Sequence, residues 1–194
     1  MAHDLEKKVN EMAYSKSDMN EHISTLVEYG QKCDHITEMG VRGIVSTWAF
    51  LGSAPDKLIS YDIYHPERWG GDLDSVYETA EQYGLNFEFI EKDVLTVEIE
   101  PTDLLFIDTW HHYDQLKVEL KLHSDKAKKY IILHDTTKYA EVGEDIGHDN
   151  TWGDTYSGKG IWFAIEEFLD DNSEWILHKR FTHCNGLTIL ERKS

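Results

Sequence analysis

Two glycines and a carboxylate are spaced along the chain in a way that could bind a nucleotide. Gly40 and Gly43 stand where a short apolar run gives way to a helical pattern. Glycine at such a turn lets the backbone approach a ligand closely, and the helix that follows begins with unpaired N–H groups. Asp62 ends the next apolar run, nineteen residues past Gly43, where a carboxylate can accept hydrogen bonds from both hydroxyls of a ribose.

Two further acids follow the same pattern. Glu38 lies two residues before Gly40, and Asp93 ends the third apolar run, where it could face an adenine amino group. Each acid alone could be a solvated strand end, but three at the carboxyl ends of successive strands favour nucleotide binding. The chain has neither GxxxxGK[ST] nor a complete GxGxxG, which argues against a triphosphate or a dinucleotide. A cofactor with a ribose, a sulfonium cation and no phosphate fits such an acidic site.

A second set of polar residues follows the fourth and fifth apolar runs. Asp108 ends one run and His111 comes three residues later, where a helical pattern begins. His134 and Asp135 end the next run, and Thr136 follows them. Neighbouring side chains of a strand point to opposite faces, so only one of His134 and Asp135 should face Asp108 unless the backbone turns there. Oxygen ligands suit Mg²⁺ or Mn²⁺, and Asp108, Asp135 and Thr136 could supply them.

The elements that must position these residues alternate between strands and helices, which predicts a parallel sheet covered by helices on both faces. The predicted strands are 35–39, 57–63, 86–92, 103–109 and 130–134, and the predicted helices are 44–51, 72–83, 113–127 and 160–169. Two last strands, 174–181 and 186–192, are separated by only four residues and must therefore pair antiparallel. We expect a doubly wound, mostly parallel seven-stranded sheet that ends in an antiparallel hairpin.

A chain of 194 residues is long enough for one well-buried core and short for two, so we expect a single domain over residues 1–194. Residues 1–33 are expected to be a helical lead-in. Residues 137–159 are rich in Gly, Asp, Asn, Thr and Ser and predict a long loop at the carboxyl edge of the sheet. Loops of that length inside a domain are often lids or substrate loops.

The charge of the chain limits its partners. It has 37 acidic and 19 basic residues, a formal net charge of −18, which disfavours nucleic acid and anionic membrane surfaces as partners. The two cysteines have no zinc-ligand spacing, and no apolar stretch approaches the roughly 20 residues of a membrane span. These features predict a cytoplasmic protein, and they leave the oligomeric state open, a homo-oligomer included.

Four motifs carry a resemblance to a known family. They are Glu38-x-Gly40 with Ser46-Thr47, Phe-Ile-Asp-Thr-Trp-His-His-Tyr at 106–113, Ile-Leu-His-Asp-Thr at 132–136, and Gly-Ile-Trp-Phe-Ala at 160–164. With them, the chain from Ser17 to Arg192 resembles the small class I S-adenosylmethionine-dependent O-methyltransferases, in particular the group related to macrocin O-methyltransferase and the cephalosporin hydroxylase-like proteins.

The resemblance implies a methyl transfer from S-adenosylmethionine to a hydroxyl of a small-molecule acceptor. It implies that the cofactor contacts Glu38, Gly40, Gly43, Ser46, Thr47, Asp62, Asp93 and Asp108. It also implies His111 as the general base beside Asp108, and Mg²⁺ or another divalent cation at Asp108 and Asp135, with Thr136 or His134 as a further ligand. The acceptor itself has no readable signature.

Three positions depart from the family pattern. Gly43 comes one position earlier than usual, which leaves open which backbone N–H groups meet the cofactor. Lys128-Lys129 replaces a Gly-Gly pair before the fifth strand, and His134 stands where the family has an acid. The last change removes one oxygen ligand from the expected cation site.

Two other functions are compatible with parts of the pattern. One is a nucleotide-binding domain that has kept the fold without catalysis, since fold does not imply function. The other is a metal-dependent hydrolase, which would not explain Glu38, Gly40 and Asp62. Its ligands and acid-base groups would be drawn from Asp108, His111, His134, Asp135 and His148.

Overall fold

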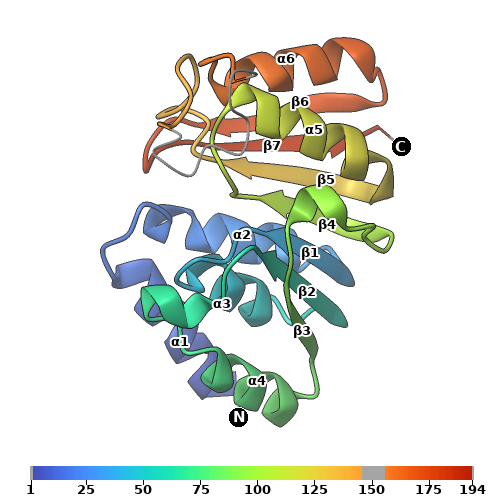
Figure 1. Cartoon of the computed structure of the whole chain (residues 1–194). Helices are drawn as coiled ribbons and strands as arrows, with labels where there is room; N and C mark the ends of the chain where they lie inside the picture. The colour runs from blue at the N-terminus through green and yellow to red at the C-terminus, as the bar shows by residue number, and fades with distance from the viewer. Residues whose placement is uncertain (1, 146–155, 194) are drawn as a thin grey trace.

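The computed structural model describes residues 2–145 and 156–193, and its centre is a seven-stranded sheet in the order β3-β2-β1-β4-β5-β7-β6 (Figure 1). The strands are β1 His35–Met39, β2 Lys57–Asp62, β3 Asn86–Glu91, β4 Thr102–Ile107, β5 Ala127–His134, β6 Trp175–Phe181 and β7 Leu187–Arg192. The first five strands pair in parallel, and β7 runs antiparallel between β5 and β6. The predicted doubly wound sheet with a terminal antiparallel hairpin is confirmed.

Helices cover both faces of the sheet. They are α1 Ala2–Tyr14, α2 Ile23–Gly30, α3 Val45–Gly52, α4 Leu73–Tyr83, α5 Tyr113–His123 and α6 Ile161–Asp171, with short 3₁₀ segments η1 Asn20–His22, η2 Pro66–Trp69, η3 Val94–Thr96 and η4 Ser124–Lys126. Figure 1 shows α1 to α4 beside the β1–β3 half of the sheet and α5 and α6 beside the β5–β7 half.

The central strand β4 shows why two layers of helices are needed. All six of its residues are buried, and its last four alternate between two apolar clusters. Leu104 and Phe106 pack in the cluster that includes α2 and α3, whereas Leu105 and Ile107 pack in the cluster with α5 and α6. Because successive side chains of a strand point to opposite faces, this apolar run is buried only with helices on both sides.

Several boundaries differ from the sequence expectation. Helix α5 ends at His123, not at residue 127, because β5 already begins at Ala127, which is fully buried in the register with Thr102 on β4. The lead-in over residues 1–33 contains two α-helices, α1 and α2. No helix in the described ranges is long and apolar enough to cross a bilayer.

The two ends of the predicted 137–159 loop lie together. Val142 and Lys159 form an antiparallel bridge, and the N–H of Gly143 donates to the carbonyl of Gly158 at 3.1 Å. Residues 146–155, which include His148, lie outside the described residues. The described part of the loop is therefore a paired stem beside the carboxyl ends of β4 and β5.

Candidate active site

Glu38, the last residue but one of β1, is a completely buried carboxylate. Its Oε1 accepts a hydrogen bond from the hydroxyl of Ser46 at 2.6 Å, and its Oε2 accepts from Thr47 at 2.9 Å and Ser60 at 2.6 Å. Burial raises the pKa of Glu38 to about 7, against the three hydroxyl hydrogen bonds that lower it. Ser46 and Thr47, expected at the cofactor, thus place their hydroxyls on Glu38, where they tie α3 to β1.

Gly40 makes the turn between β1 and the segment leading to α3. Its φ is +87°, and a Cβ added there would collide with the backbone carbonyl of Asp108. The N–H of Asp108 in turn donates to the carbonyl of Met39 at 2.8 Å. Only glycine fits this position, because both the left-handed backbone and the close approach exclude a side chain.

Gly43 has no comparable constraint. A Cβ on Gly43 would meet nothing within 4 Å, and the left-handed residues of this segment are its neighbours Arg42 (φ 43°) and Ile44 (φ 60°). Because Ile44 has left-handed backbone, α3 begins at Val45, one residue later than expected. Gly43 comes one position earlier than in the family that the sequence resembles. In this chain the residues on either side of it, Arg42 and Ile44, have positive φ instead.

Asp62 fastens the glycine turn to the end of β2. Its Oδ2 accepts from the N–H groups of Val41 at 2.8 Å and Arg42 at 2.9 Å, and its Oδ1 accepts from Tyr64 at 3.0 Å. Asp93 lies two residues past β3, where its Oδ1 accepts from the N–H of Leu95 at 2.9 Å and caps η3. Both carboxylates are half-buried at the carboxyl edge, so each still has lone pairs for a ligand.

His134 and Asp135 both reach the pair formed by Asp108 and His111, although they are neighbours in the chain. Asp135 has φ +59°, so the backbone turns immediately after β5 instead of continuing its alternation. The Nδ1 of His134 lies 3.1 Å from Asp108 Oδ1, and Asp135 Oδ2 lies 3.1 Å from the Nε2 of His111. The turn that the sequence left open is therefore present.

His134 acts as a hydrogen-bond donor on both sides of its ring. Its Nε2 lies 3.0 Å from the carbonyl of Asp18 and 3.2 Å from that of Cys184, and carbonyl oxygens only accept. Burial lowers the pKa of His134, but the Asp108 carboxylate overrides burial and raises the pKa to about 9. A protonated ring with both nitrogens engaged replaces the acid expected at this position, and it offers no lone pair to a cation.

Thr136, the other expected ligand, also faces elsewhere. Its hydroxyl is buried and lies 2.8 Å from the hydroxyl of Thr188 on β7. His111 occupies the third position beside the two aspartates instead: its Nε2 is 3.0 Å from Asp108 Oδ1. For a methyltransferase, the sequence analysis had assigned His111 to acid-base chemistry and not to the cation.

Four groups surround the ring of His111. In addition to Asp108 and Asp135 at Nε2, the Nδ1 lies 2.9 Å from Glu144 Oε2, and the ring stacks on Tyr139 at 5.1 Å between centroids. Burial lowers the pKa of His111, but the hydrogen bonds to Asp108 and Glu144 raise it to about 10. Below this pKa the His111 ring carries a proton on both nitrogens. It must lose one of them before it can accept a proton from an acceptor.

The carboxylates themselves are shifted in opposite directions. Burial opposes ionisation of Asp108, but His134 and His111 hold the pKa of this carboxyl well below its usual range. Burial raises the pKa of Asp135, and among the described residues its Oδ1 has no hydrogen-bond partner.

Sequence reasoning missed Glu144 and Tyr139, because they belong to the 137–159 loop and no spacing links them to His111.

One ligand atom each from Asp108, His111 and Asp135 lie within 4.8 Å of one another. Two carboxylates and an imidazole are donors that Mn²⁺, Fe²⁺ or Zn²⁺ accept readily, whereas Mg²⁺ prefers oxygen alone. The unpartnered Oδ1 of Asp135 adds a buried acceptor that a cation would satisfy. The residues present therefore fit a divalent cation, with His111 in place of Thr136 or His134.

No family model matches the sequence, and no curated protein matches it. Solved structures do match. The S-adenosylhomocysteine-bound methyltransferase PaMTH1 of Podospora anserina superposes with a TM-score of 0.60 at 16% identity, covering 98% of this chain and 88% of that one. An O-methyltransferase from Bacillus cereus gives 0.62 at 17% identity, with 98% and 91% covered. TomG, an O-methyltransferase from Streptomyces achromogenes, gives 0.56 at 14%, with 98% and 89% covered.

This chain has the class I methyltransferase fold. In doubly wound sheets ligands bind at the carboxyl ends of the strands, where the strand order reverses. Here the reversal lies between β1 and β4, whose ends carry Gly40 and Asp108. The glycine turn and the Asp108 cluster thus share the place at which a methyltransferase fold would bind its ligands.

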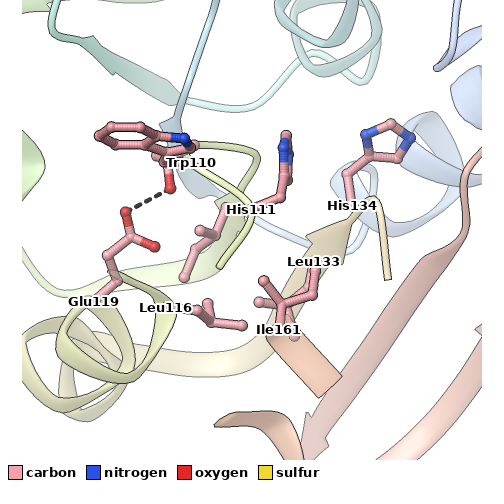
Figure 2. A pocket seen from close by; sticks show the side chains of 9 residues that line it. Trp110, His111, Leu116, Glu119, Leu133, His134 and Ile161 are labelled. Atoms are coloured by element: carbon pink, nitrogen blue, oxygen red, sulfur yellow. Dashed lines mark hydrogen bonds between the residues drawn. The ribbon is translucent and has the colours of Figure 1, made fainter. Parts of the chain in front are cut away.

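A cavity of about 10 Å³ lies under the cluster, below His111 and His134 (Figure 2). Glu119 on α5 reaches its lining, where Oε1 accepts from Thr109 at 2.5 Å and Gln115 at 2.7 Å. Glu119 Oε2 is buried without a partner in the described structure, and burial raises the pKa of this carboxyl to about 7. The cavity is too small for an acceptor and has room for about one water molecule.

Proposed function

We propose that residues 1–194 form one S-adenosylmethionine-dependent O-methyltransferase domain acting on a hydroxyl of a small molecule. The observation that carries the proposal is the contact between Gly40 and the backbone of Asp108, since it joins the glycine turn to the acid-base cluster at the reversal of strand order. A cofactor over the turn would present its reactive group to the cluster. In support, PaMTH1 and the Bacillus enzyme were crystallised with S-adenosylhomocysteine, and TomG with S-adenosylmethionine.

The cofactor would lie along the carboxyl ends of β1, β2 and β3. Asp62 has lone pairs left for the ribose hydroxyls beyond its bonds to Val41 and Arg42, and Asp93 would face the adenine. Glu38, Ser46 and Thr47 would support the turn from below. S-adenosylmethionine supplies an electrophilic methyl group on a positively charged sulfur, and an acidic edge without phosphate-binding motifs suits that charge.

His111 would take the proton of the acceptor hydroxyl at Nε2, the nitrogen that faces Asp108 and Asp135. In-line transfer needs the acceptor oxygen aligned with the methyl group, and a positioned base removes the proton as the new C–O bond forms. A divalent cation held by Asp108 and Asp135 alone would supply positive charge that favours the deprotonated acceptor, because His111 Nε2 cannot bind the cation while it serves as the base. The hydrogen bond from the buried His134 would hold the Asp108 carboxylate in one orientation beside the reacting groups.

Acceptor selectivity would come from the segments that the sequence left unassigned. The 137–159 loop supplies Glu144 to His111, and the 1–33 lead-in supplies the Asp18 carbonyl to His134. Both segments therefore border the cluster. We further propose a cytoplasmic protein, in keeping with its acidic composition and its two free cysteines, Cys33 and Cys184.

The proposal is tested by calorimetry with S-adenosylhomocysteine, with NAD as the comparison ligand. We expect saturable binding of S-adenosylhomocysteine at one site and no binding of NAD. A panel of hydroxylated small molecules with methyl-labelled cofactor then tests transfer. If S-adenosylhomocysteine produces no heat and no rise in melting temperature, the proposal is wrong, and the hydrolase alternative becomes the stronger one.

A further inference from the structure

Glu144 contacts His111 through both its side chain and its backbone. Its Oε2 lies 2.9 Å from the Nδ1 of His111, and its N–H donates to the carbonyl of His111 at 2.9 Å. The two residues are 33 positions apart in the sequence, on different loops. The side-chain bond is thus reinforced by a main-chain bond between the same two residues.

The position of Glu144 is fixed by the stem of the 137–159 loop. A Cβ on Gly143 would come within 2.8 Å of the Cβ of His112, of the Lys159 carbonyl and of the Tyr156 hydroxyl, so the stem approaches the 111–113 segment as closely as a backbone can. The Tyr156 hydroxyl donates to the Glu144 carbonyl at 2.8 Å. The closely packed stem therefore holds Glu144 beside His111.

The chemical consequence lies in the tautomer of His111. A neutral imidazole carries its proton on either nitrogen, and the hydrogen bond at one nitrogen decides which. A carboxylate only accepts, so Glu144 keeps the proton on Nδ1. When His111 is neutral, the lone pair is then on Nε2, which faces Asp108 and Asp135. Without Glu144, the neutral ring would carry its proton on Nε2, because the carboxylates of Asp108 and Asp135 face that nitrogen.

We propose that Glu144 is a positioning residue that holds the Nδ1–H of His111 and so makes Nε2 the nitrogen that accepts a proton or binds a cation. Its use in methyl transfer rests on the proposed function, whereas the tautomer does not. Glu144 would act through His111, the residue that its side chain and backbone contact. Carboxylates in this outer position contribute about 10- to 100-fold to metal affinity or activity in other histidine sites.

The first test is nitrogen-15 NMR of the whole chain over a pH series, read above the midpoint at which the His111 ring becomes neutral, with that ring assigned by its loss in His111→Gln. We expect a proton at Nδ1 that exchanges slowly with water. It should persist in Glu144→Gln, whose amide oxygen still accepts, and exchange rapidly in Glu144→Ala. Glu141→Ala is the matched control, since Glu141 lies on the same stem and is exposed. An Nδ1 proton that is unchanged in Glu144→Ala would overturn the proposal.

The second test measures Mn²⁺ affinity by calorimetry together with kcat. Glu144→Ala should weaken Mn²⁺ binding or lower kcat by about 10- to 100-fold while S-adenosylhomocysteine affinity stays unchanged. Glu144→Gln should restore much of the loss. If S-adenosylhomocysteine does not bind but the Nδ1 proton still depends on Glu144, the positioning role stands and the methyltransferase function fails. If Mn²⁺ affinity, cofactor binding and kcat are all intact in Glu144→Ala, the positioning role fails and the function stands.

Discussion

Gly40 packs directly against the backbone carbonyl of Asp108, and no side chain fits between them. The contact joins the proposed cofactor turn to the cluster at the end of β4. Gly40→Ala should therefore disturb both, through the collision and through a φ of +87°, which costs of order 1–3 kcal/mol for a residue with a side chain. Gly43→Ala, at an open position, should have little effect. Urea unfolding and S-adenosylhomocysteine calorimetry check both variants, and equal behaviour of the two would contradict this account.

Asp62 offers a second test of the same turn. Asp62→Ala should weaken S-adenosylhomocysteine binding by about 1–3 kcal/mol, because ribose hydroxyls and the N–H groups of Val41 and Arg42 lose their acceptor. Asp62→Asn keeps one acceptor oxygen and should lose less. Asp56, exposed before the other end of β2, is the matched control. Unchanged affinity of Asp62→Ala would remove this residue from the site.

The cation site is tested by metal removal. EDTA should abolish turnover, and Mn²⁺ should restore it, because two carboxylates and one imidazole lie within reach of a common centre. Anomalous scattering from Mn²⁺-soaked crystals should place a peak among Asp108, His111 and Asp135. Asp135→Asn should weaken Mn²⁺ binding more than Thr136→Ser, since the Thr136 hydroxyl faces Thr188. Full activity in EDTA with no peak would exclude the cation role.

The sheet could be predicted from the sequence because its signals are local. Buried parallel strands such as β4 read as continuous apolar runs, and the four residues between the last two strands allow only an antiparallel pairing. Boundaries were less accurate where tertiary pairing decides them, as at Ala127, whose strand starts where a helical pattern was still continuing. These differences move element ends without changing the strand order.

The site was predicted only in part, because its decisive features are not local. The approach of Asp135 depends on its own left-handed backbone, a conformation that is uncommon for any residue with a side chain, although Asp adopts it more often than most. The binding of Ser46 and Thr47 to Glu38 and the arrival of Glu144 at His111 depend on contacts between distant segments. Residue types at strand ends indicated the region, whereas the partners of each group required the structure.

Glu119 gives a prediction about stability and pH. Burial raises its pKa from 4.5 to about 7, so the folded chain binds more protons at this carboxyl than the unfolded chain does between these values. The contribution of Glu119 to the free energy of unfolding is therefore largest below pH 4.5. It decreases as pH rises toward 7, by up to about 3 kcal/mol. Glu119→Gln should gain stability relative to the parent chain as pH rises through this range. Urea unfolding at several pH values checks it, and a pH-independent difference would contradict it.

His111 is the group on which the proposed chemistry depends most. His111→Ala should lower kcat by about 10²- to 10⁴-fold and leave S-adenosylhomocysteine affinity nearly unchanged, as expected for a lost general base. The matched control is His65→Ala, a partly exposed histidine just before η2 that lies outside the cluster.

The pH dependence of the rate tests whether His111 must be neutral. A neutral ring is required, and the carboxylates of Asp108 and Glu144 raise the pKa of His111 from 6.5 to about 10 in the free chain. The rate should therefore be low at acid pH and rise as pH increases, with its acid limb above the ordinary histidine value of roughly 6.5. Glu144→Gln removes one of these carboxylates and should move the limb to lower pH. If chemistry limits the rate and His111→Ala keeps full activity with the same limb, His111 is structural, and the proton must leave through another group of the cluster, first Asp135.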